Sequence, residues 1–543
     1  PKAQYASYWH GLRTSKTTIH NDGVSALNDD LKQNMNSFFN PSRPSPRPWP
    51  NRKKQTNKSA ICICSVSLLA VLFVFVFFIT YSEIPKSLFS ISAFSGSVQF
   101  PQCRSEILSR TLLGQRFLWY APHSGFSNQL SEFKNAVLMA GILNRTLIVP
   151  PVLDHHAVAL GSCPKFRVLS PSEIRVSVWN HSIELLRSGR YVSIADIVDI
   201  SSLVSSSAVR VIDLRFFASL LCGVDLETLC SGELAEQSQA YESLKQCGYL
   251  LSGVRGNVDK CLYAVEEDCR TTVWTYRNGD SDGRLDFFQP DEKLKKKKKK
   301  MSYVRRRRDV FKTLGHGTEA ESVAILAFGS LFTAPYKGSE LYIDIHKSSE
   351  MKSLIEKVDF LPFVREIMSA GKKYVSETIK APFLCAQLRL LDGQFKNHRE
   401  STFMGLNQKL ESLSVKNPGP VHVFVMTDLP ESNWTGTYLG DLSKNSTNFK
   451  LHFLREQDEV VVRTQQGLAS ASHGQKFGSI PMSMDNIKKM QKHCSPRKVS
   501  NVQLYIEEAV CSCASLGFVG TAGSTIADSV EMMRKSNACS SSS

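Results

Sequence analysis

The sequence lacks the short motifs that identify several large enzyme classes. It contains no Gly-X-X-X-X-Gly-Lys-Ser/Thr loop and no His-Glu-X-X-His pair, which excludes P-loop nucleotidases and zinc proteases of that type. It also has no Cys-X-X-Cys pair, so the usual spacing of zinc ligands is missing. No Asp-X-Asp triplet follows a predicted strand, where many sugar transferases hold a divalent metal ion. The sequence therefore predicts neither a bound metal nor a resident cofactor.

Acidic residues are scarce in two segments, and this scarcity explains the net charge of +16. Residues 293–308 hold eleven lysines and arginines and no acid, while residues 1–60 hold ten bases and three acids. The rest of the chain is close to neutral, which argues against a basic face for nucleic acid spread over a folded domain. We expect residues 293–308 to form a solvated loop, inserted at the surface, because such a run does not pack into a core.

One long stretch has no charge at all. Residues 61–81 (ICICSVSLLAVLFVFVFFITY) number 21, and at about 1.5 Å per residue a helix of this length crosses the roughly 30 Å of a bilayer core. Basic residues flank mainly its N-terminal side, which stays cytoplasmic in membrane proteins. The pattern predicts a single-pass type II signal anchor, with a disordered cytosolic tail over residues 1–60. We expect a Golgi or ER membrane location with the catalytic part in the lumen.

Cysteines and glycosylation motifs fit a lumenal location. Twelve of the fourteen cysteines follow the predicted anchor, and an even number in an oxidising compartment is compatible with disulfide bonds. Five that lie close in sequence are expected to form disulfide bonds within one local subregion: Cys222, Cys230, Cys247, Cys261 and Cys269. Four Asn-X-Ser/Thr sequons also follow the anchor, at Asn144, Asn180, Asn433 and Asn445.

Strands alternate with helices in two successive parts of the chain. After a stem over residues 82–111, residues 112–375 predict a first domain and residues 376–543 a second one. Buried strands of the second domain are predicted at residues 383–389, 421–428, 450–454 and 517–520. Alternation of this kind implies a largely parallel sheet in each domain. The predicted fold class is therefore α/β, with two Rossmann-like domains facing a cleft.

Polar residues stand at the first predicted strand–helix junction. Residues 116–120 predict a strand, and apolar residues spaced by three and four predict a helix from about residue 130. Between them lie Gly125, which permits a close backbone approach, and the amides Asn128 and Gln129. At the carboxyl end of a parallel strand such a loop faces the ligand crevice, and the start of the helix offers free N–H groups to phosphate.

Two junctions of the second domain carry complementary groups. Arg389 ends one predicted strand, and residues 521–525 supply hydroxyls and N–H groups at the start of the last helix. A permanent cation combined with several neutral donors can bind a diphosphate bidentately. Together with the first loop, these residues favour a cleft for a nucleotide diphosphate whose leaving group is stabilised by side chains instead of a metal.

At these residues the sequence resembles a known family. The segments SGFSNQ (124–129) and LNRTLIVPP (143–151) are similar to the first signature of GDP-fucose protein O-fucosyltransferases, in particular their large plant branch. Residues 385–389 and 517–528 resemble the family's His-Leu-Arg segment and its last nucleotide-binding turn. The resemblance covers roughly residues 112–535. It implies a GT-B architecture and an inverting, metal-independent glycosyltransferase that uses GDP-fucose.

The resemblance also implies roles for individual residues. Arg389 would bind the β-phosphate and stabilise the departing GDP, and is the expected catalytic residue. The other nucleotide-sugar contacts would be Gly125, Phe126, Asn128, Gln387, Asp428, Ser524 and Thr525. Two of these depart from the family, since Gln387 replaces a common histidine and Gly125 an arginine found in some members.

A catalytic base is not evident from the sequence. The carboxylates nearest to the motifs are Glu132 and Asp392, and both are better explained as surface or capping acids. We expect the rate of fucose transfer to depend more on stabilising the departing GDP than on activating the acceptor, because fucose readily supports oxocarbenium character.

Three alternatives stay open. The same fold could use another nucleotide-sugar such as an activated rhamnose, the acceptor could be a protein or a cell-wall polysaccharide, and the chain could be a non-catalytic lumenal binding protein. The replacement at Gln387 and the basic insertion favour the last of these.

Overall fold

The structure is a computed structural model, and it describes residues 115–540 with several gaps. Every described residue belongs to one compact unit, Val98–Ser543. The predicted tail, anchor and stem therefore lie outside the described residues. Among the helices that are described, none is both long and apolar enough to cross a membrane. The gaps are residues 155–168, 206–208, 226–227, 230–232, 254–260, 268–271, 277–284, 289–302, 332–340, 344–348, 392, 417–418, 478–495 and 497–498.

The first sheet has five strands in the order β3-β2-β1-β8-β4, and all of its pairings are parallel. Its strands are β1 (Phe117–Trp119), β2 (Thr146–Val149), β3 (Val211–Asp213), β4 (Leu262–Ala264) and β8 (Ile325–Ala327). The predicted amphipathic helix is α5 (Phe126–Ile142), with Phe133, Val137 and Ala140 buried against one face. The other face of this sheet packs on α6 (Pro171–Arg187), α8 (Leu214–Cys222) and α10 (Leu234–Gly248). This confirms the α/β prediction for the first half.

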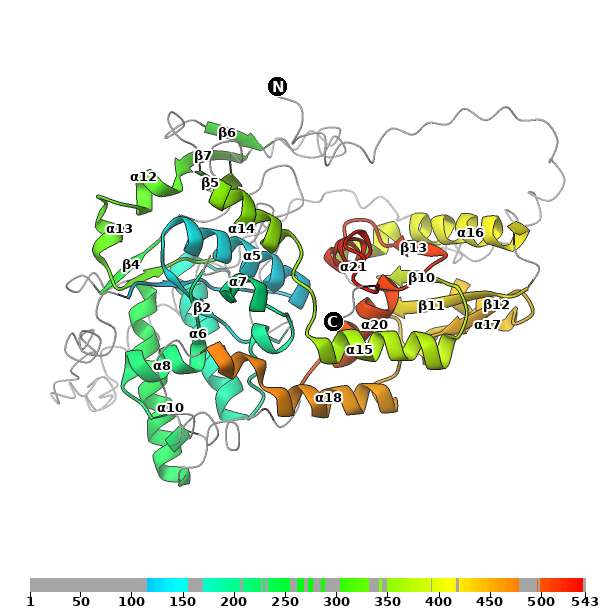
Figure 1. Ribbon diagram of the computed structural model, residues 1–543, viewed down its shortest axis with the longest axis horizontal. Helices are drawn as coiled ribbons and strands as arrows, with labels where there is room; N and C mark the ends of the chain where they lie inside the picture. The colour runs from blue at the N-terminus through cyan, green and yellow to red at the C-terminus, as the bar shows by residue number, and fades with distance from the viewer. Residues whose placement is uncertain are drawn as a thin grey trace, which may run out of the picture. The chain divides into compact units, whose positions relative to one another are not determined.

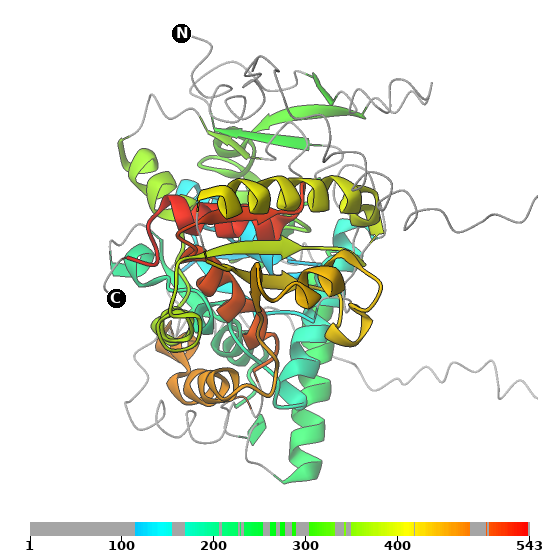
Figure 2. The ribbon, with the colours of Figure 1, turned by 90° about the vertical axis from the view of Figure 1, so that its right-hand side faces the viewer.

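The second sheet has four parallel strands in the order β12-β11-β10-β13. Its strands are β10 (Phe383–Leu388), β11 (Val421–Thr427), β12 (Phe449–His452) and β13 (Gly517–Gly520), close to the predicted ranges. Alternate residues of β10 and β11 enter two different apolar clusters, as the period of two in a strand requires. Helix α16 (Arg399–Lys416) covers one face, and α15 (Arg365–Tyr374), α18 (Glu459–Ala471) and α20 (Val502–Ser512) cover the other (Figures 1 and 2).

One apolar cluster is common to both sheets. It contains Leu118 and Leu147 of the first sheet together with Cys385 and Phe424 of the second. The predicted domain boundary at residue 375/376 falls inside a continuous helical stretch, since α15 runs directly into a π-helical turn, η5 (Val375–Ile379). The two predicted halves therefore share buried apolar surface, although each has its own sheet.

A third, four-stranded sheet corrects one prediction. Its strands are β5 (Thr272–Tyr276), β6 (Leu285–Phe288), β7 (Tyr303–Asp309) and β9 (Leu341–Ile343), and β7 lies between β5 and β6. The four arginines 305–308 thus belong to a strand, and their prediction as a solvated loop was wrong. Arg306 is exposed, and Arg308 pairs with Glu267 at 3.1 Å. A strand tolerates this run because successive side chains point to opposite faces and long stems carry their charges to solvent.

Three disulfide bonds are present among the described residues. They join Cys222 to Cys247, Cys385 to Cys511 and Cys513 to Cys539. The first confirms part of the predicted set of local disulfide bonds, whereas Cys230 and Cys269 lie outside the described residues. The second links β10 to α20 and so fixes a helix onto the strand that ends at Arg389.

Candidate functional site

The carboxyl edge of the second sheet gathers three of the predicted segments. The parallel register pairs Leu388 with Thr427 and Gln387 with Gly520. The residues that follow these strands, Arg389, Asp428 and Thr521, must therefore emerge at the same edge. This is the edge at which open α/β sheets bind their ligands.

Thr521 connects two of these segments directly. Its Oγ1 accepts a hydrogen bond from the Arg389 backbone N–H at 2.9 Å and donates one to the Gln387 carbonyl at 3.1 Å. Its own N–H donates to the Gln387 carbonyl at 3.0 Å and to Oε1 at 3.2 Å. Gln387 is buried, so its amide helps hold the turn after β13. Thr521 lies in the predicted segment 521–525, but the sequence assigned it no individual contact and did not reveal that its hydroxyl holds the Arg389 backbone.

Arg389 is half-buried, with its guanidinium carbon 4.7 Å from the centre of the Phe395 ring. This contact orients the cation while leaving its charge at the sheet edge. The Asp428 carboxylate accepts hydrogen bonds from the N–H groups of Leu390 (2.7 Å) and Leu391 (3.1 Å). Asp428 therefore shapes the loop after Arg389, and its contact with the nucleotide-sugar stays a prediction.

The third segment ends in the start of helix α21 (Thr525–Lys535). Ser524 is the N-cap, is 0% exposed, and its Oγ has no hydrogen-bond partner in the described part of the chain. Thr525, the first helical residue, is half-buried. The first N–H groups of a helix carry partial positive charge and lack partners within the helix. With Arg389 on the neighbouring strand end, this helix start has the donors that a phosphate group needs.

The first loop lies against the second half through an aromatic contact. Phe126, the first residue of α5, is 4.7 Å from the Tyr505 ring of α20, centre to centre, and α5 also contacts α21. Gly125 is the N-cap of α5, and the half-buried Asn128 donates its N–H to the Gly125 carbonyl at 3.0 Å. The first turn of α5, which carries Asn128, is thus held beside the helix pair of the second half.

Gln129 has a structural role that its sequence position did not reveal. Its Nε2 donates to the carbonyls of Ser124 (2.7 Å) and Leu153 (3.0 Å), and its Oε1 accepts from the Leu153 N–H (2.9 Å). The amide is fully buried, and both its nitrogen and its oxygen make hydrogen bonds to the backbone. Of the two amides predicted as ligand donors, Gln129 instead ties the loop after β1 to the loop after β2.

Glu132 is neither a surface acid nor a capping acid, so that part of the prediction was wrong. It is 0% exposed and accepts hydrogen bonds from the His123 N–H, the Ser330 hydroxyl and the Leu331 N–H. The His123 ring Nδ1 lies 2.5 Å from its Oε1. Because both oxygens bind loops after β1 and β8, Glu132 holds these loops together and is poorly placed to act as a base. Asp392, the other candidate base, lies outside the described residues.

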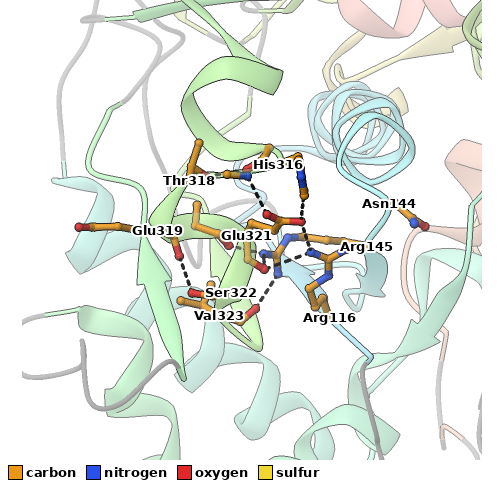
Figure 3. A network of polar contacts seen from close by, with 12 residues as sticks. Arg116, Asn144, Arg145, His316, Thr318, Glu319, Glu321, Ser322 and Val323 are labelled. Atoms are coloured by element: carbon orange, nitrogen blue, oxygen red, sulfur yellow. Dashed lines mark hydrogen bonds and ion pairs between the residues drawn. The ribbon is translucent and has the colours of Figure 1, made fainter.

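A polar network at the opposite edge of the first sheet explains another part of the signature. Arg145 donates to the carbonyls of Phe117 (3.2 Å) and Val323 (3.1 Å) and also to that of Ala320, as Figure 3 shows in part. Glu321 accepts from the Gly317 N–H at 2.7 Å and contacts His316 and Arg116, and these contacts lower the pKa of its carboxyl to about 2. Arg145 therefore fastens the amino ends of β1, β2 and β8 and does not face the predicted cleft.

No group of three or more histidine, cysteine, aspartate or glutamate side chains that could hold a metal ion occurs within the described ranges. One Asp-Ser-Asp triplet, residues 280–282, follows β5, a strand that the sequence did not predict. The triplet lies outside the described residues. Metal independence accordingly stays a prediction.

The geometry defines an α/β protein in which three groups meet at the carboxyl edge of a parallel sheet: the Arg389 guanidinium, the buried Ser524 hydroxyl and the start of α21. No protein-family model matches the chain. O-fucosyltransferase 30 of Arabidopsis thaliana is 87% identical over 508 residues, which cover 94% of this chain and 100% of that protein. At this identity and coverage, the chain belongs to the O-fucosyltransferase family.

Two solved structures of POFUT1 show more distant similarity. The complex with GDP-fucose has a TM-score of 0.33 and 13% identity, covering 78% of this chain and 94% of that chain. The complex with GDP has a TM-score of 0.33 and 12% identity, covering 78% of this chain and 94% of that chain.

Proposed function

We propose that this protein is a fucosyltransferase that moves fucose from GDP-fucose to a hydroxyl of a protein or glycan acceptor. The observation that supports it best is the convergence of Arg389, Ser524 and the start of α21 at one sheet edge, in a chain of the O-fucosyltransferase family. The proposal includes the GT-B arrangement of two Rossmann-like domains around a cleft.

In this mechanism the diphosphate of the donor lies at the carboxyl edge of the second sheet. The Arg389 guanidinium and the N–H groups that start α21 stabilise the negative charge that builds up on the β-phosphate as the fucose C1–O bond breaks. The acceptor oxygen attacks C1 from the opposite face, which inverts the anomeric configuration, and its proton leaves to a base or to water. These groups need no metal to carry the charge, so we propose a metal-independent reaction.

The first loop would complete the donor site. Asn128 and the backbone at Gly125 and Phe126 would contact the sugar or the nucleotide, because the Phe126–Tyr505 contact holds this loop against the second half. Gln387 would act indirectly, since its amide shapes the turn at Thr521.

The test of the donor and of Arg389 uses the full-length protein in detergent. We expect calorimetry to show GDP binding in the presence of EDTA, with weaker binding of UDP and ADP, and we expect fucose transfer from GDP-fucose. Arg389→Ala should lower kcat by about 10²–10³-fold, as loss of one preorganised donor does in other enzymes. Arg455→Ala is the matched control, because Arg455 also lies over an aromatic ring (4.4 Å from Phe453) but is exposed and paired with Glu431. Full turnover by the Arg389 variant, or no GDP binding by the wild type, would refute the assignment.

We also propose that the protein is a type II membrane protein of the Golgi or ER with its catalytic part in the lumen. The uncharged segment 61–81 and the three disulfides support this location, because disulfides persist in oxidising compartments. Protease treatment of intact microsomes should remove only the N-terminal tail. Digestion of the whole chain without detergent would contradict the topology.

A further inference from the structure

Residues 472–477, which we call the strap, reach from the second half of the molecule to the first sheet. The strap follows α18, which packs on α15 and α20, and its turn η8 (His473–Phe477) contacts β3 and the short helix η2 (Ile194–Asp196). The Gly474 N–H donates to Asp196 Oδ1 at 2.6 Å. A Cβ at Gly474 would lie 2.5 Å from the Ser193 Cβ and 3.1 Å from Asp213 Oδ2. The strap therefore docks closely, and only a glycine fits at this position.

The strap docks on a buried charged cluster at the carboxyl end of β3, which we call the seat. Asp213 Oδ1 accepts hydrogen bonds from Arg215 Nε (2.8 Å), from the Arg215 N–H (3.0 Å) and from the Tyr191 hydroxyl (3.2 Å). The Arg215 guanidinium lies 4.6 Å from the centre of the Tyr191 ring. Asp196, Asp213 and Arg215 are each at most 3% exposed. The seat thus holds three ionisable groups away from water.

Docking leaves several polar atoms of the seat and the strap without partners. Arg215 Nη1 and Nη2, Asp213 Oδ2 and both amide atoms of Gln475 have no hydrogen bond within the described part of the molecule. The buried Arg175 differs sharply, because its Nε, Nη1 and Nη2 donate to Leu251, Val265 and Ser252 respectively. A buried polar atom without a hydrogen-bond partner destabilises the docked state, and this penalty is removed when the site opens and water reaches the atom. Within the described contact with the seat, the docked strap is therefore held by close packing and the Gly474–Asp196 hydrogen bond, and opposed by these unpartnered atoms.

We propose that the strap is a latch that exchanges between a docked state and a released state. Release hydrates Arg215, Asp213 and Gln475, which offsets the loss of the Gly474–Asp196 hydrogen bond. His473, whose ring lies 3.1 Å from both carboxylate oxygens of Glu366 on α15, keeps the released strap near the second half. Release uncovers the carboxyl end of β3, an edge at which α/β proteins admit ligands. This proposal does not depend on the identity of the donor.

Hydrogen exchange of the full-length protein tests the latch with two opposed variants. Gly474→Ala places a methyl group against Ser193 and should release the strap, raising exchange in residues 472–477 by roughly tenfold or more. Gln475→Met keeps the length of the side chain and removes two unpartnered polar atoms, so it should slow the same exchange by roughly tenfold. Gly467→Ala is the matched control, since a Cβ there meets only the Glu366 Cγ at 3.9 Å, and exchange in the strap should not change.

The two variants separate a latch from a strap that is permanently docked or never docked. If Gln475→Met leaves exchange unchanged or accelerates it, water or another partner satisfies the seat and the latch proposal is wrong. If Gly474→Ala leaves exchange unchanged, the strap does not dock as described. Should Gly474→Ala prevent folding, the Gln475→Met result still decides. None of these readouts requires GDP or fucose transfer, so failure of the proposed function leaves the test intact.

Discussion

At the scale of single residues, the arrangement of Arg389 depends on a hydroxyl. The Thr521 Oγ1 accepts from the Arg389 N–H while it donates to the Gln387 carbonyl, so one side chain fixes the strand end that carries the cation. A neutral side chain thus positions the charge, and no histidine is needed at residue 387 for this purpose.

Removing that hydroxyl should weaken catalysis without unfolding the protein. Thr521→Val keeps the shape but leaves the Arg389 N–H without its partner, which costs about 1–3 kcal/mol when the group is buried. We expect kcat/KM for GDP-fucose to fall about tenfold and the midpoint of thermal unfolding to fall by only a few degrees, so that the variant stays folded in the assay. Thr464→Val is the control, because the Thr464 hydroxyl donates only to the carbonyl of Val460 within α18. Equal activity of both variants would show that Thr521 has no positioning role.

A second residue-scale effect concerns the buried acids of α20. Burial raises the pKa of Glu508 to about 7 and that of Glu507 to about 8. Glu508 accepts from the Ser529 hydroxyl of α21 at 2.6 Å, so it also bridges the two helices. Because the folded pKa lies above the unfolded value near 4.5, the folded state binds more protons between these pH values. Stability should therefore fall as the pH rises from about 4.5 towards 7–8 and then level off.

Glu508→Gln should remove part of this pH dependence. The amide is neutral at every pH and can still accept from Ser529, so the variant avoids the cost of burying a carboxylate. We expect it to be more stable than the wild type by about 1–3 kcal/mol at pH 8 and equally stable at pH 4. Chemical denaturation at both pH values measures this difference. Glu531→Gln, on the exposed side of α21, should give no gain at either pH, and a gain equal to that of the Glu508 variant would show that burial of the Glu508 carboxylate is not the cause.

At the scale of secondary-structure elements, one disulfide couples the predicted catalytic strand to its helix layer. Cys385 lies within β10, four residues before Arg389, and Cys511 lies near the end of α20. The double variant Cys385→Ala/Cys511→Ala should lose about 2–4 kcal/mol of unfolding free energy. It should also bind GDP more weakly, because the end of β10 carries Arg389.

The bond between Cys222 and Cys247 provides the comparison, since it joins α8 to α10 beside the first sheet. Its double alanine variant should lose stability but keep its affinity for GDP. Calorimetric titration of both variants distinguishes a local effect on the phosphate edge from a general one. If both pairs lower GDP affinity equally, the β10 bond has no special part in the site.

The elements differ in how far the sequence predicts them. Strands β10 and β11 were predicted because an unbroken apolar run must be buried on both faces of a sheet, and Arg389 follows directly from such a run. The strand that contains residues 305–308 was missed, because four successive arginines do not show the alternation of apolar and polar residues by which a strand is predicted. Contacts such as Glu132 with Leu331, or Gly474 with Asp196, join residues about 200 or more positions apart. No local pattern encodes such contacts, so the sequence pointed to the site's loops but not to the groups that hold them.

At the scale of the whole described structure, the two parallel sheets share one apolar cluster, and each sheet has a second cluster of its own on its other face. Phe126, the first residue of α5, lies 4.7 Å from Tyr505 and 6.3 Å from Phe363, ring centre to ring centre. Residues of both sheets and of helices α15, α18 and α20 belong to the same cluster. A common core of this kind couples the stability of its parts, so we expect the wild type to unfold in a single calorimetric transition.

Phe126→Ala tests whether this aromatic contact couples the two sheets. Loss of a buried phenylalanine should cost about 3 kcal/mol or more, and removal of the contact with Tyr505 should split the calorimetric transition in two. Phe217→Ala is the control, because Phe217 is also buried but lies 5.2 Å from Phe117, ring centre to ring centre, in a cluster of the first sheet alone. That variant should lower the midpoint while keeping one transition. Two transitions in the wild type would mean that the two sheets unfold independently and are not coupled. One transition in the Phe126 variant would mean that the coupling resides elsewhere in the shared core. If the split is observed, the first turn of α5, which carries Asn128, and the helices beside the phosphate edge are held together by apolar packing before any donor binds.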